Sequence, residues 1–269
     1  KNIKIIDSEL GDIDAKKFLY YENFAKSFLT KNNLVLFLGD NDSESIAFYL
    51  IFLRLNQCQI LLEQNINQLN LKLIIKKFQP EFIFYPNKFS HPKNYSIIFQ
   101  LNKYNIIKRE TKNKLKINKN IAVLISTSGT TGESKFVKLS FDNIINNSIA
   151  IQAYLKLNKK DVGITTLPLA YSYGFSVINI HLLQDLKIVC NKKSIIEKDF
   201  WHLVSKYKVT NFAGVPFTFE IFDKLNFYEK NLYKLRFITQ AGGRLNNQII
   251  TKICDNFEKR KINFYVMYG

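Results

Sequence analysis

Short apolar runs alternate with segments of helical spacing along most of the chain, from residue 34 to the last residues. A strand followed by a helix and a second strand forms a βαβ unit, and repeated units favour a mainly parallel sheet. The predicted strands cover residues 34–38, 58–62, 81–85, 96–100, 105–108, 121–126, 136–139, 162–167, 186–190, 210–214, 235–240 and 262–267. The predicted helices cover residues 43–55, 67–78, 140–155, 176–183, 198–207, 217–225 and 246–259. The alternation therefore predicts an α/β protein.

Local signals indicate how two of the early helices begin and face the core. Ser43 or Ser45 is predicted to cap the helix over 43–55, because a serine hydroxyl can accept from the free N–H groups of a first turn. Leu69, Leu73 and Ile74 share helical spacing, so we expect them to form the apolar face of the following helix.

A polar, lysine-rich segment at residues 109–120 separates two series of these units. Segments of this composition are commonly solvated connectors. We therefore predict two α/β subdomains with mainly parallel sheets, over residues 1–108 and 121–269. No sequence repeat relates the two halves.

The chain is strongly basic, with 39 Lys and Arg against 22 Asp and Glu and a net charge of +17. A balance of this size makes a polyanion such as nucleic acid a conceivable partner. The basic residues are spread along the chain and are not gathered in one arm, which favours a general composition bias. We therefore expect no nucleic-acid partner, and a nonenzymatic polyanion-binding module remains an alternative.

The cysteines and the apolar runs bear on the cellular compartment. The three cysteines lie far apart and form no CxxC or Cys/His cluster, so no metal site and no disulfide framework is predicted. The longest strongly apolar run, residues 46–53, is much shorter than the roughly 20 residues of a membrane helix. The sequence therefore predicts a cytoplasmic protein without a membrane span.

The most informative segment is the loop over residues 126–135, which follows a predicted strand directly. Gly129 and Gly132 let successive N–H groups converge on an anion, and Lys135 adds a positive charge suited to a phosphate. The hydroxyl groups that can add further donors belong to Thr127, Ser128, Thr130 and Thr131. The loop is not a Walker A motif, in which the lysine follows the second glycine immediately. It is nevertheless predicted to hold a phosphate.

This loop resembles the phosphate loop of the adenylate-forming superfamily, which includes acyl-CoA synthetases, peptide adenylation domains and luciferases. Ser134 and Phe136 replace the proline and glycine that are usual in that family. Further resemblances follow in the family's order at residues 167–175, 211–216, 240–244 and 264–269. The resemblance implies that the chain corresponds to a truncated large N-terminal domain of an adenylate-forming enzyme.

The resemblance also implies an activity and a role for each matching residue. The expected activity is an ATP-dependent, AMP-forming ligation of a carboxylic acid to CoA or to a phosphopantetheinyl carrier protein, with Mg²⁺ as a cofactor. Lys135 and Thr131 are the catalytic candidates. ATP is expected to contact Thr127, Ser128, Gly129, Thr130, Thr131, Gly132, Lys135, Ala241, Gly242, Gly243 and Tyr268. The acyl group is expected to contact Tyr173, Gly174, Ala213, Gly214 and Val215.

The printed chain ends within the family's Y-G-x-T-E motif, of which it contains Tyr268 and Gly269. In the family, the glutamate of this motif holds Mg²⁺, and an aspartate and a lysine further on serve the ribose and the chemistry. No metal ligand is therefore assigned to this chain, and we expect the printed chain to be inactive by itself. A conventional ADP-forming NTPase remains a second alternative.

Overall fold

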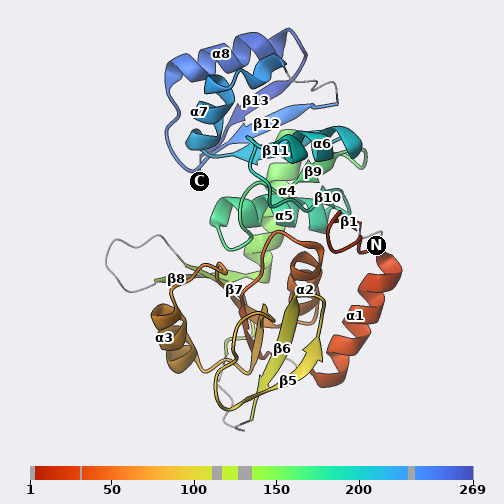
Figure 1. The fold of residues 1–269 in the computed structure, drawn as a ribbon, viewed down its shortest axis with the longest axis vertical. Helices are drawn as coiled ribbons and strands as arrows, with labels where there is room; N and C mark the ends of the chain where they lie inside the picture. The colour runs from red at the N-terminus through yellow and green to blue at the C-terminus, as the bar shows by residue number, and fades with distance from the viewer. Residues whose placement is uncertain (1–3, 31, 111–116, 127–134, 230–233, 269) are drawn as a thin grey trace.

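The computed structural model describes residues 4–30, 32–110, 117–126, 135–229 and 234–268. Within these ranges the strands form two sheets, one in the lower and one in the upper part of Figure 1. Helices pack against both sheets. This arrangement confirms the predicted α/β fold class.

The lower sheet has the strand order β5-β6-β4-β2-β3-β7-β8 among the described residues. Its strands are β2 (Leu34–Phe37), β3 (Cys58–Leu61), β4 (Phe82–Pro86), β5 (Tyr95–Gln100), β6 (Tyr104–Arg109), β7 (Ile121–Ser126) and β8 (Phe136–Ser140). The central strands β4, β2, β3 and β7 are parallel, whereas β5, β6 and β8 pair in the antiparallel sense at the two sides. The lower sheet is therefore mixed.

The upper sheet has the strand order β1-β10-β9-β11-β12-β13 within the described ranges, and every pairing in it is parallel. Its strands are β1 (Ile5–Ile6), β9 (Val162–Ile164), β10 (Lys187–Val189), β11 (Asn211–Gly214), β12 (Phe237–Gln240) and β13 (Asn263–Val266). Because all these strands run the same way, their carboxyl ends lie along one edge of the sheet.

Sheet membership does not follow the division of the chain at residues 109–120. β7 and β8 come after this segment, yet β7 pairs with β3 and completes the lower sheet. β1 comes near the start of the chain, yet it pairs with β10 in the upper sheet. The connections between the sheets therefore pass in both directions, and they place the carboxyl-terminal end of β7 near the upper sheet.

The α-helices of the described residues are α1 (Ala15–Phe28), α2 (Ser43–Arg54), α3 (Gln68–Phe78), α4 (Phe141–Leu155), α5 (Ser172–Leu183), α6 (Lys198–Lys206), α7 (Pro216–Lys224) and α8 (Asn247–Glu258).

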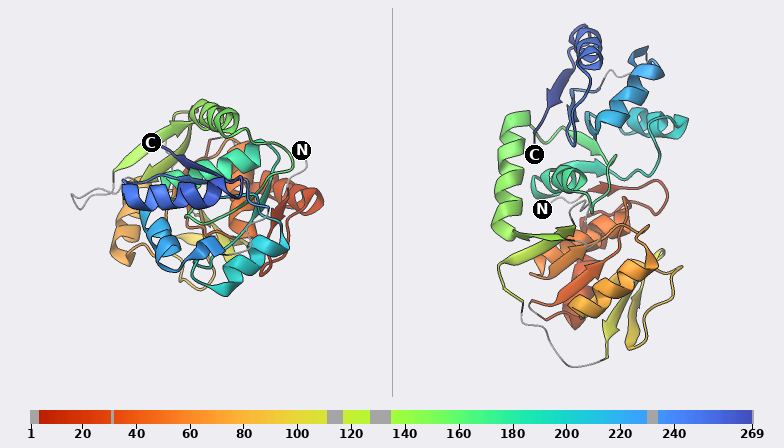
Figure 2. Two further views of the ribbon diagram at one scale, coloured as in Figure 1. Left: turned by 90° about the horizontal axis from the view of Figure 1, so that it is seen from above. Right: turned by 90° about the vertical axis from the view of Figure 1, so that its left-hand side faces the viewer.

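Helices cover both faces of the upper sheet. Phe237 and Ile238, neighbours on β12, point to opposite faces: Phe237 packs with residues of α4 and α5, and Ile238 with residues of α6, α7 and α8. Figure 2 shows α4 rising from β8 alongside the upper sheet.

Three local predictions are corrected by the structure. Asp42, and not Ser43 or Ser45, caps α2, because its carboxylate accepts from the Ser45 N–H at 2.9 Å. In α3, Leu69 and Leu73 are 66% and 56% exposed, so only Ile74 of the three predicted core residues is buried. α5 begins at Ser172, four positions before the predicted start.

None of the helices among the described residues has the length and apolar character that crossing a membrane requires.

The junction between the two sheets is held by a buried hydrogen bond and a pair of ionic contacts. Tyr49 of α2 donates its hydroxyl to Asn179 Oδ1 of α5 at 2.7 Å. Lys192 Nζ lies 2.8 Å from a carboxylate oxygen of Asp42 and 2.8 Å from one of Asp40. The Asp42 side chain is 2% exposed, so its negative charge depends on partners within the protein.

His181 is a buried histidine of α5 that packs against the backbone of Gly163 in β9. Its Nδ1 donates to the Val177 carbonyl oxygen at 2.8 Å, since a carbonyl can only accept. Burial lowers the pKa of His181 below its ordinary value, because the charged imidazolium would lose its hydration. The folded protein therefore keeps this side chain neutral.

We expect acid to destabilise the fold through His181. As the pH falls below the ordinary histidine value of 6.5, the unfolded chain takes up a proton that the folded chain resists, so the unfolding free energy decreases. His181→Gln should remove about 1 kcal/mol of the stability difference between about pH 7 and pH 5. Urea titrations of the wild-type protein and the variant at the two pH values measure this difference in unfolding free energy. Ile180→Val is the control, because it destabilises the same helix without removing a titrating group, and an unchanged pH difference in His181→Gln would contradict the account.

Candidate active site

A cavity of about 570 Å³ lies at the carboxyl edge of the upper sheet, where α4, α5 and the end of β13 meet. Ligands of open parallel sheets commonly bind outside the carboxyl ends of the strands. The cavity is lined by Ile125, Leu139, Asn143, Ile144, Asn147, Ser148, Ile151, Tyr171, Ser172, Tyr173, Phe175, Ser176, Asn179, Ala241, Gly242, Met267 and Tyr268. Residues from both sheets therefore contribute to one site.

Gly174 sets the position of α5 at this cavity. A Cβ atom at this position would overlap the Pro168 carbonyl oxygen and lie 2.7 Å from the Leu167 carbonyl oxygen. The first turn of α5 therefore packs directly on the backbone that leads into it. This contact brings Tyr171 and Tyr173 to the cavity, although Gly174 itself does not line it.

Tyr173 joins α5 to the upper sheet. Its hydroxyl lies 2.6 Å from Thr239 Oγ1 of β12, and both side chains are buried. Burial raises the pKa of Tyr173 above its ordinary value, so the hydroxyl stays neutral at physiological pH. With its hydroxyl engaged by the sheet, Tyr173 presents an aromatic surface to the cavity.

The turn after β12 forms another wall of the cavity. Gly242 has a φ of +81°, which an L side chain rarely adopts, and a Cβ there would lie 2.5 Å from the Tyr171 hydroxyl oxygen. Gln240 braces the turn by donating its side-chain amide to the Gly243 carbonyl oxygen at 2.9 Å. The turn therefore offers a backbone surface with little side-chain bulk, which suits the close approach of a flat base.

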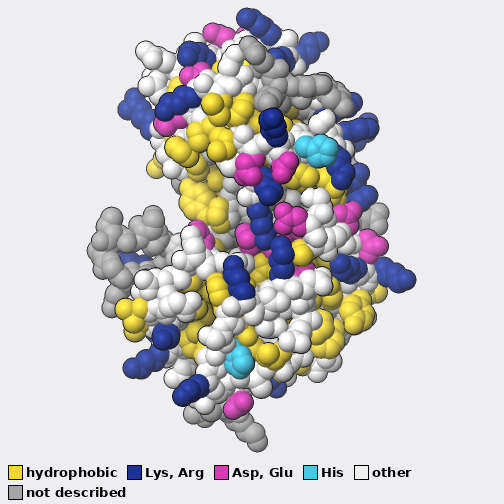
Figure 3. Space-filling model, in the orientation of Figure 1, with side chains coloured by type: hydrophobic (Ala, Val, Ile, Leu, Met, Phe, Trp, Pro, Cys, Tyr) yellow, Lys and Arg dark blue, Asp and Glu magenta, His cyan; other side chains and the backbone are white. Residues whose placement is uncertain are grey.

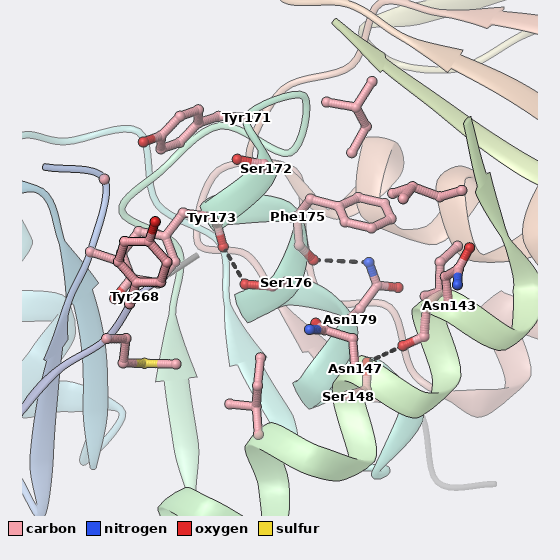
Figure 4. Close-up of a pocket in the computed structure, with 17 residues that line it drawn as sticks. Asn143, Asn147, Ser148, Tyr171, Ser172, Tyr173, Phe175, Ser176, Asn179 and Tyr268 are labelled. Atoms are coloured by element: carbon pink, nitrogen blue, oxygen red, sulfur yellow. Dashed lines mark hydrogen bonds between the residues drawn. The ribbon is translucent and has the colours of Figure 1, made fainter. Parts of the chain in front are cut away.

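Tyr268, which follows β13 beside this turn, also lines the cavity, and its side chain is entirely open at 105% exposure. The strand before it is held in register, because the Met267 N–H donates to the Gln240 carbonyl oxygen at 2.7 Å. Figure 4 shows the Tyr268 ring across the cavity from α4. An exposed ring beside a glycine turn can stack on an aromatic ligand.

The predicted site residues divide into four groups. Tyr173, Ala241, Gly242 and Tyr268 line the cavity. Gly174, Ala213, Gly214, Val215 and Gly243 lie behind this lining, where they hold its parts together. The predicted phosphate-loop residues Thr127, Ser128, Gly129, Thr130, Thr131 and Gly132 lie outside the described residues. Lys135 follows them, exposed, one residue before β8 begins.

The contribution of α4 to the cavity was not predicted from the sequence. Asn143, Asn147 and Ser148 line the cavity from this helix, at positions i, i+4 and i+5. That spacing is the only signal in the sequence, and it does not distinguish a cavity wall from a solvent-exposed face. Ser176 and Asn179 of α5 complete the polar part of the lining.

The described residues contain no group of three or more His, Cys, Asp or Glu side chains that could hold a metal ion. We assign no chemical step to the metal.

Comparison with known proteins gives the family. The family model for the AMP-binding enzyme matches residues 29–269. This match covers most of the chain, so the chain belongs to the AMP-binding enzyme family.

Curated relatives of the chain are named as CoA ligases. 4-Coumarate–CoA ligase-like 6 of Arabidopsis thaliana is 30% identical over 101 residues, which is 36% of this chain and 18% of the relative. The oxalate–CoA ligase of Arabidopsis thaliana is 27% identical over 150 residues, 54% of this chain and 29% of the relative. The matches thus span less than a third of either relative.

Solved structures share the fold over the whole chain. The o-succinylbenzoate CoA synthetase of Bacillus subtilis, in complex with its acyl-adenylate intermediate, has a TM-score of 0.77 at 16% identity. The superposition covers 100% of this chain and 56% of that protein. VinN has a TM-score of 0.75 at 15% identity, covering 100% of this chain and 70% of that protein. At these identities the likeness establishes the fold.

We expect Gly174→Ala to destabilise the protein, against the usual preference of helices. Alanine in place of glycine ordinarily stabilises a helix interior by about 1 kcal/mol. Here the added methyl group meets the carbonyl oxygens of Leu167 and Pro168, and overpacking of this kind costs about 1–3 kcal/mol. Chemical denaturation of the variant and of the exposed control Ser172→Ala measures the difference, and a more stable Gly174→Ala protein would show that the contact does not exist.

Proposed function

We propose that the intact protein is an ATP-dependent, AMP-forming carboxylate ligase. A carboxylate oxygen attacks the α-phosphorus of ATP, the bond to the β-phosphate oxygen breaks, and pyrophosphate leaves with the electron pair. The acyl-adenylate then transfers its acyl group to a thiol of CoA or of a carrier protein. The observation that carries this proposal is the single cavity where the Gly242 turn, Tyr268 and α5 meet, in a chain of the AMP-binding enzyme family.

Each part of the cavity has a proposed role. Ala241, Gly242, Gly243 and Tyr268 would frame the adenine ring, by backbone contact on one side and by stacking on the other. Tyr173 would contact the acyl group, and Gly174, Ala213, Gly214 and Val215 would fix the wall behind it. Positioning and electrostatic stabilisation carry most of the rate of phosphoryl-type reactions, so rigid walls are what the chemistry requires.

The phosphate end of the site is assigned to the loop between β7 and β8. Ser126 pairs with Phe136, so the two strands hold both ends of the loop side by side. Lys135 and Thr131 would act on the phosphates, together with the N–H groups of Gly129 and Gly132.

The cellular setting is proposed from the cysteines. Cys58, Cys190 and Cys254 are all free thiols, and burial raises the pKa of Cys58 to about 12 and that of Cys190 above its ordinary value. The buried thiols of Cys58 and Cys190 are unreactive, and free thiols need no oxidising compartment, which supports a cytoplasmic location.

The distribution of charge does not favour the polyanion-binding alternative. Figure 3 shows lysine and arginine side chains scattered over the face from top to bottom, with acidic side chains among them. A binding surface for nucleic acid usually concentrates its basic residues in one patch or stripe.

Product identity tests the proposed function against the NTPase alternative. The intact protein is incubated with ATP, Mg²⁺, a set of carboxylic acids and CoA, and the nucleotides are separated by chromatography. The ligase produces AMP and pyrophosphate only when an acid is present. Release of ADP, or release of AMP that does not depend on any acid, would contradict the proposal.

We expect Lys135→Ala in the intact enzyme to slow adenylation by about 100-fold and to affect thioester formation from preformed acyl-adenylate much less. The reason is that the lysine serves the leaving pyrophosphate, which is absent from the second step. Pyrophosphate exchange and single-turnover thioester formation measure the two steps separately. Lys138→Ala, three residues further along the chain on β8, is the control for a change in surface charge, and an equal loss in both steps would argue against the role of Lys135.

A further inference from the structure

The inner part of the cavity lies between α4 and α5, and its described side chains carry no charge. The described lining residues include no Asp, Glu, His, Lys or Arg. Ile144 and Phe175 are only 4% and 5% exposed, and they give this part an apolar wall. A group that enters between the two helices therefore meets no counter-ion among the described residues.

The buried polar groups of the lining are already hydrogen-bonded within the protein. Ser148 Oγ donates to the Ile144 carbonyl oxygen at 2.8 Å. Asn179 donates to the Phe175 carbonyl oxygen at 2.9 Å and accepts from the Tyr49 hydroxyl at 2.7 Å. Figure 4 marks the bonds of Ser148 and of Asn179 to Phe175 with dashed lines. A carboxylate leaves water at great cost unless it is paired, and these groups have little left to offer it.

The rim of the cavity is polar but also neutral. Asn143, Asn147 and Ser172 line it and are exposed. Amides and hydroxyls of this kind can exchange hydrogen bonds with an uncharged polar substituent of a ligand, and they bring no formal charge. The described lining thus combines an uncharged polar rim with an apolar interior.

We propose that this cavity selects a monocarboxylic acid with an uncharged, largely apolar tail and rejects acids with a second carboxylate. The inference rests on the proposed ligase function, in which the one carboxylate faces ATP while the tail enters between α4 and α5. Similar proteins are named for oxalate and for o-succinylbenzoate, acids that each have two carboxyl groups. The proposal therefore assigns this chain a different substrate class from theirs.

A matched pair of acids tests the inference in the intact protein. Hexanoate and adipate share a six-carbon chain, and adipate ends in a second carboxylate. Acid-dependent pyrophosphate exchange gives kcat/KM for each acid. We expect adipate to be poorer than hexanoate by at least about 100-fold, because its distal charge finds no partner in the cavity.

Two arginine variants test whether the α4 wall is responsible. Asn147→Arg adds a cation to the lining and should raise the adipate-to-hexanoate ratio of kcat/KM by at least about 10-fold, since an arginine can pair with the distal carboxylate. Asn146→Arg adds the same charge to the exposed neighbour that does not line the cavity, and its ratio should stay within about two-fold of the wild-type ratio.

The outcomes separate this inference from the proposed function. Comparable use of hexanoate and adipate by the wild-type protein overturns the inference and leaves the ligase function standing. A ratio that Asn147→Arg does not change, or that Asn146→Arg changes equally, shows that the tail does not enter beside α4. Absence of exchange with every acid tested, monocarboxylic and dicarboxylic, overturns the ligase function and the inference with it.

Discussion

The close contact between the first turn of α5 and the backbone of Leu167 and Pro168 is the constraint on which the candidate site depends. Only a residue without a side chain fits there, and Gly174 provides it. With α5 fixed in this way, Tyr173 reaches Thr239 on β12 and ties the helix to the carboxyl edge of the upper sheet. The cavity is the space left between this helix, α4 and the turn at Gly242.

The same helix also connects the two sheets. Phe175 of α5 belongs to the core that contains α2 and the lower sheet, whereas Ile180, on the same helix, packs with Leu155 of α4 and Phe237 of the upper sheet. The buried carboxylate of Asp42 adds an electrostatic link, because the Lys192 ammonium lies against it across the junction. Through α5, the core that contains β7 of the lower sheet is thereby connected to the core on the upper sheet.

Much of this structure could be predicted from local sequence patterns. The features that were missed either lack a local signal or depend on long-range contacts. The βαβ alternation predicted strands and helices from residue 34 onward, and Gly242 and Tyr268, both expected to contact ATP, line one cavity. The start of α5 was missed because Tyr171 caps it without any side-chain hydrogen bond, so no local signal marks it. The membership of β7 in the lower sheet depends on pairing with β3, about sixty residues earlier, and adjacent residues do not encode it.

The most direct measurement of the central claim is a crystal structure of the protein with a hydrolysis-resistant acyl-adenylate analogue that carries a hexanoyl group. The account predicts adenine between Tyr268 and the turn at Gly242, with the acyl chain between α4 and α5. The structure has a second cleft whose lining includes basic side chains, Lys193 and Lys206, and acidic ones, Glu9 and Asp199, so it is a charged alternative to the uncharged cavity. An analogue bound in that cleft, or an acyl chain directed away from α4 and α5, would contradict the account.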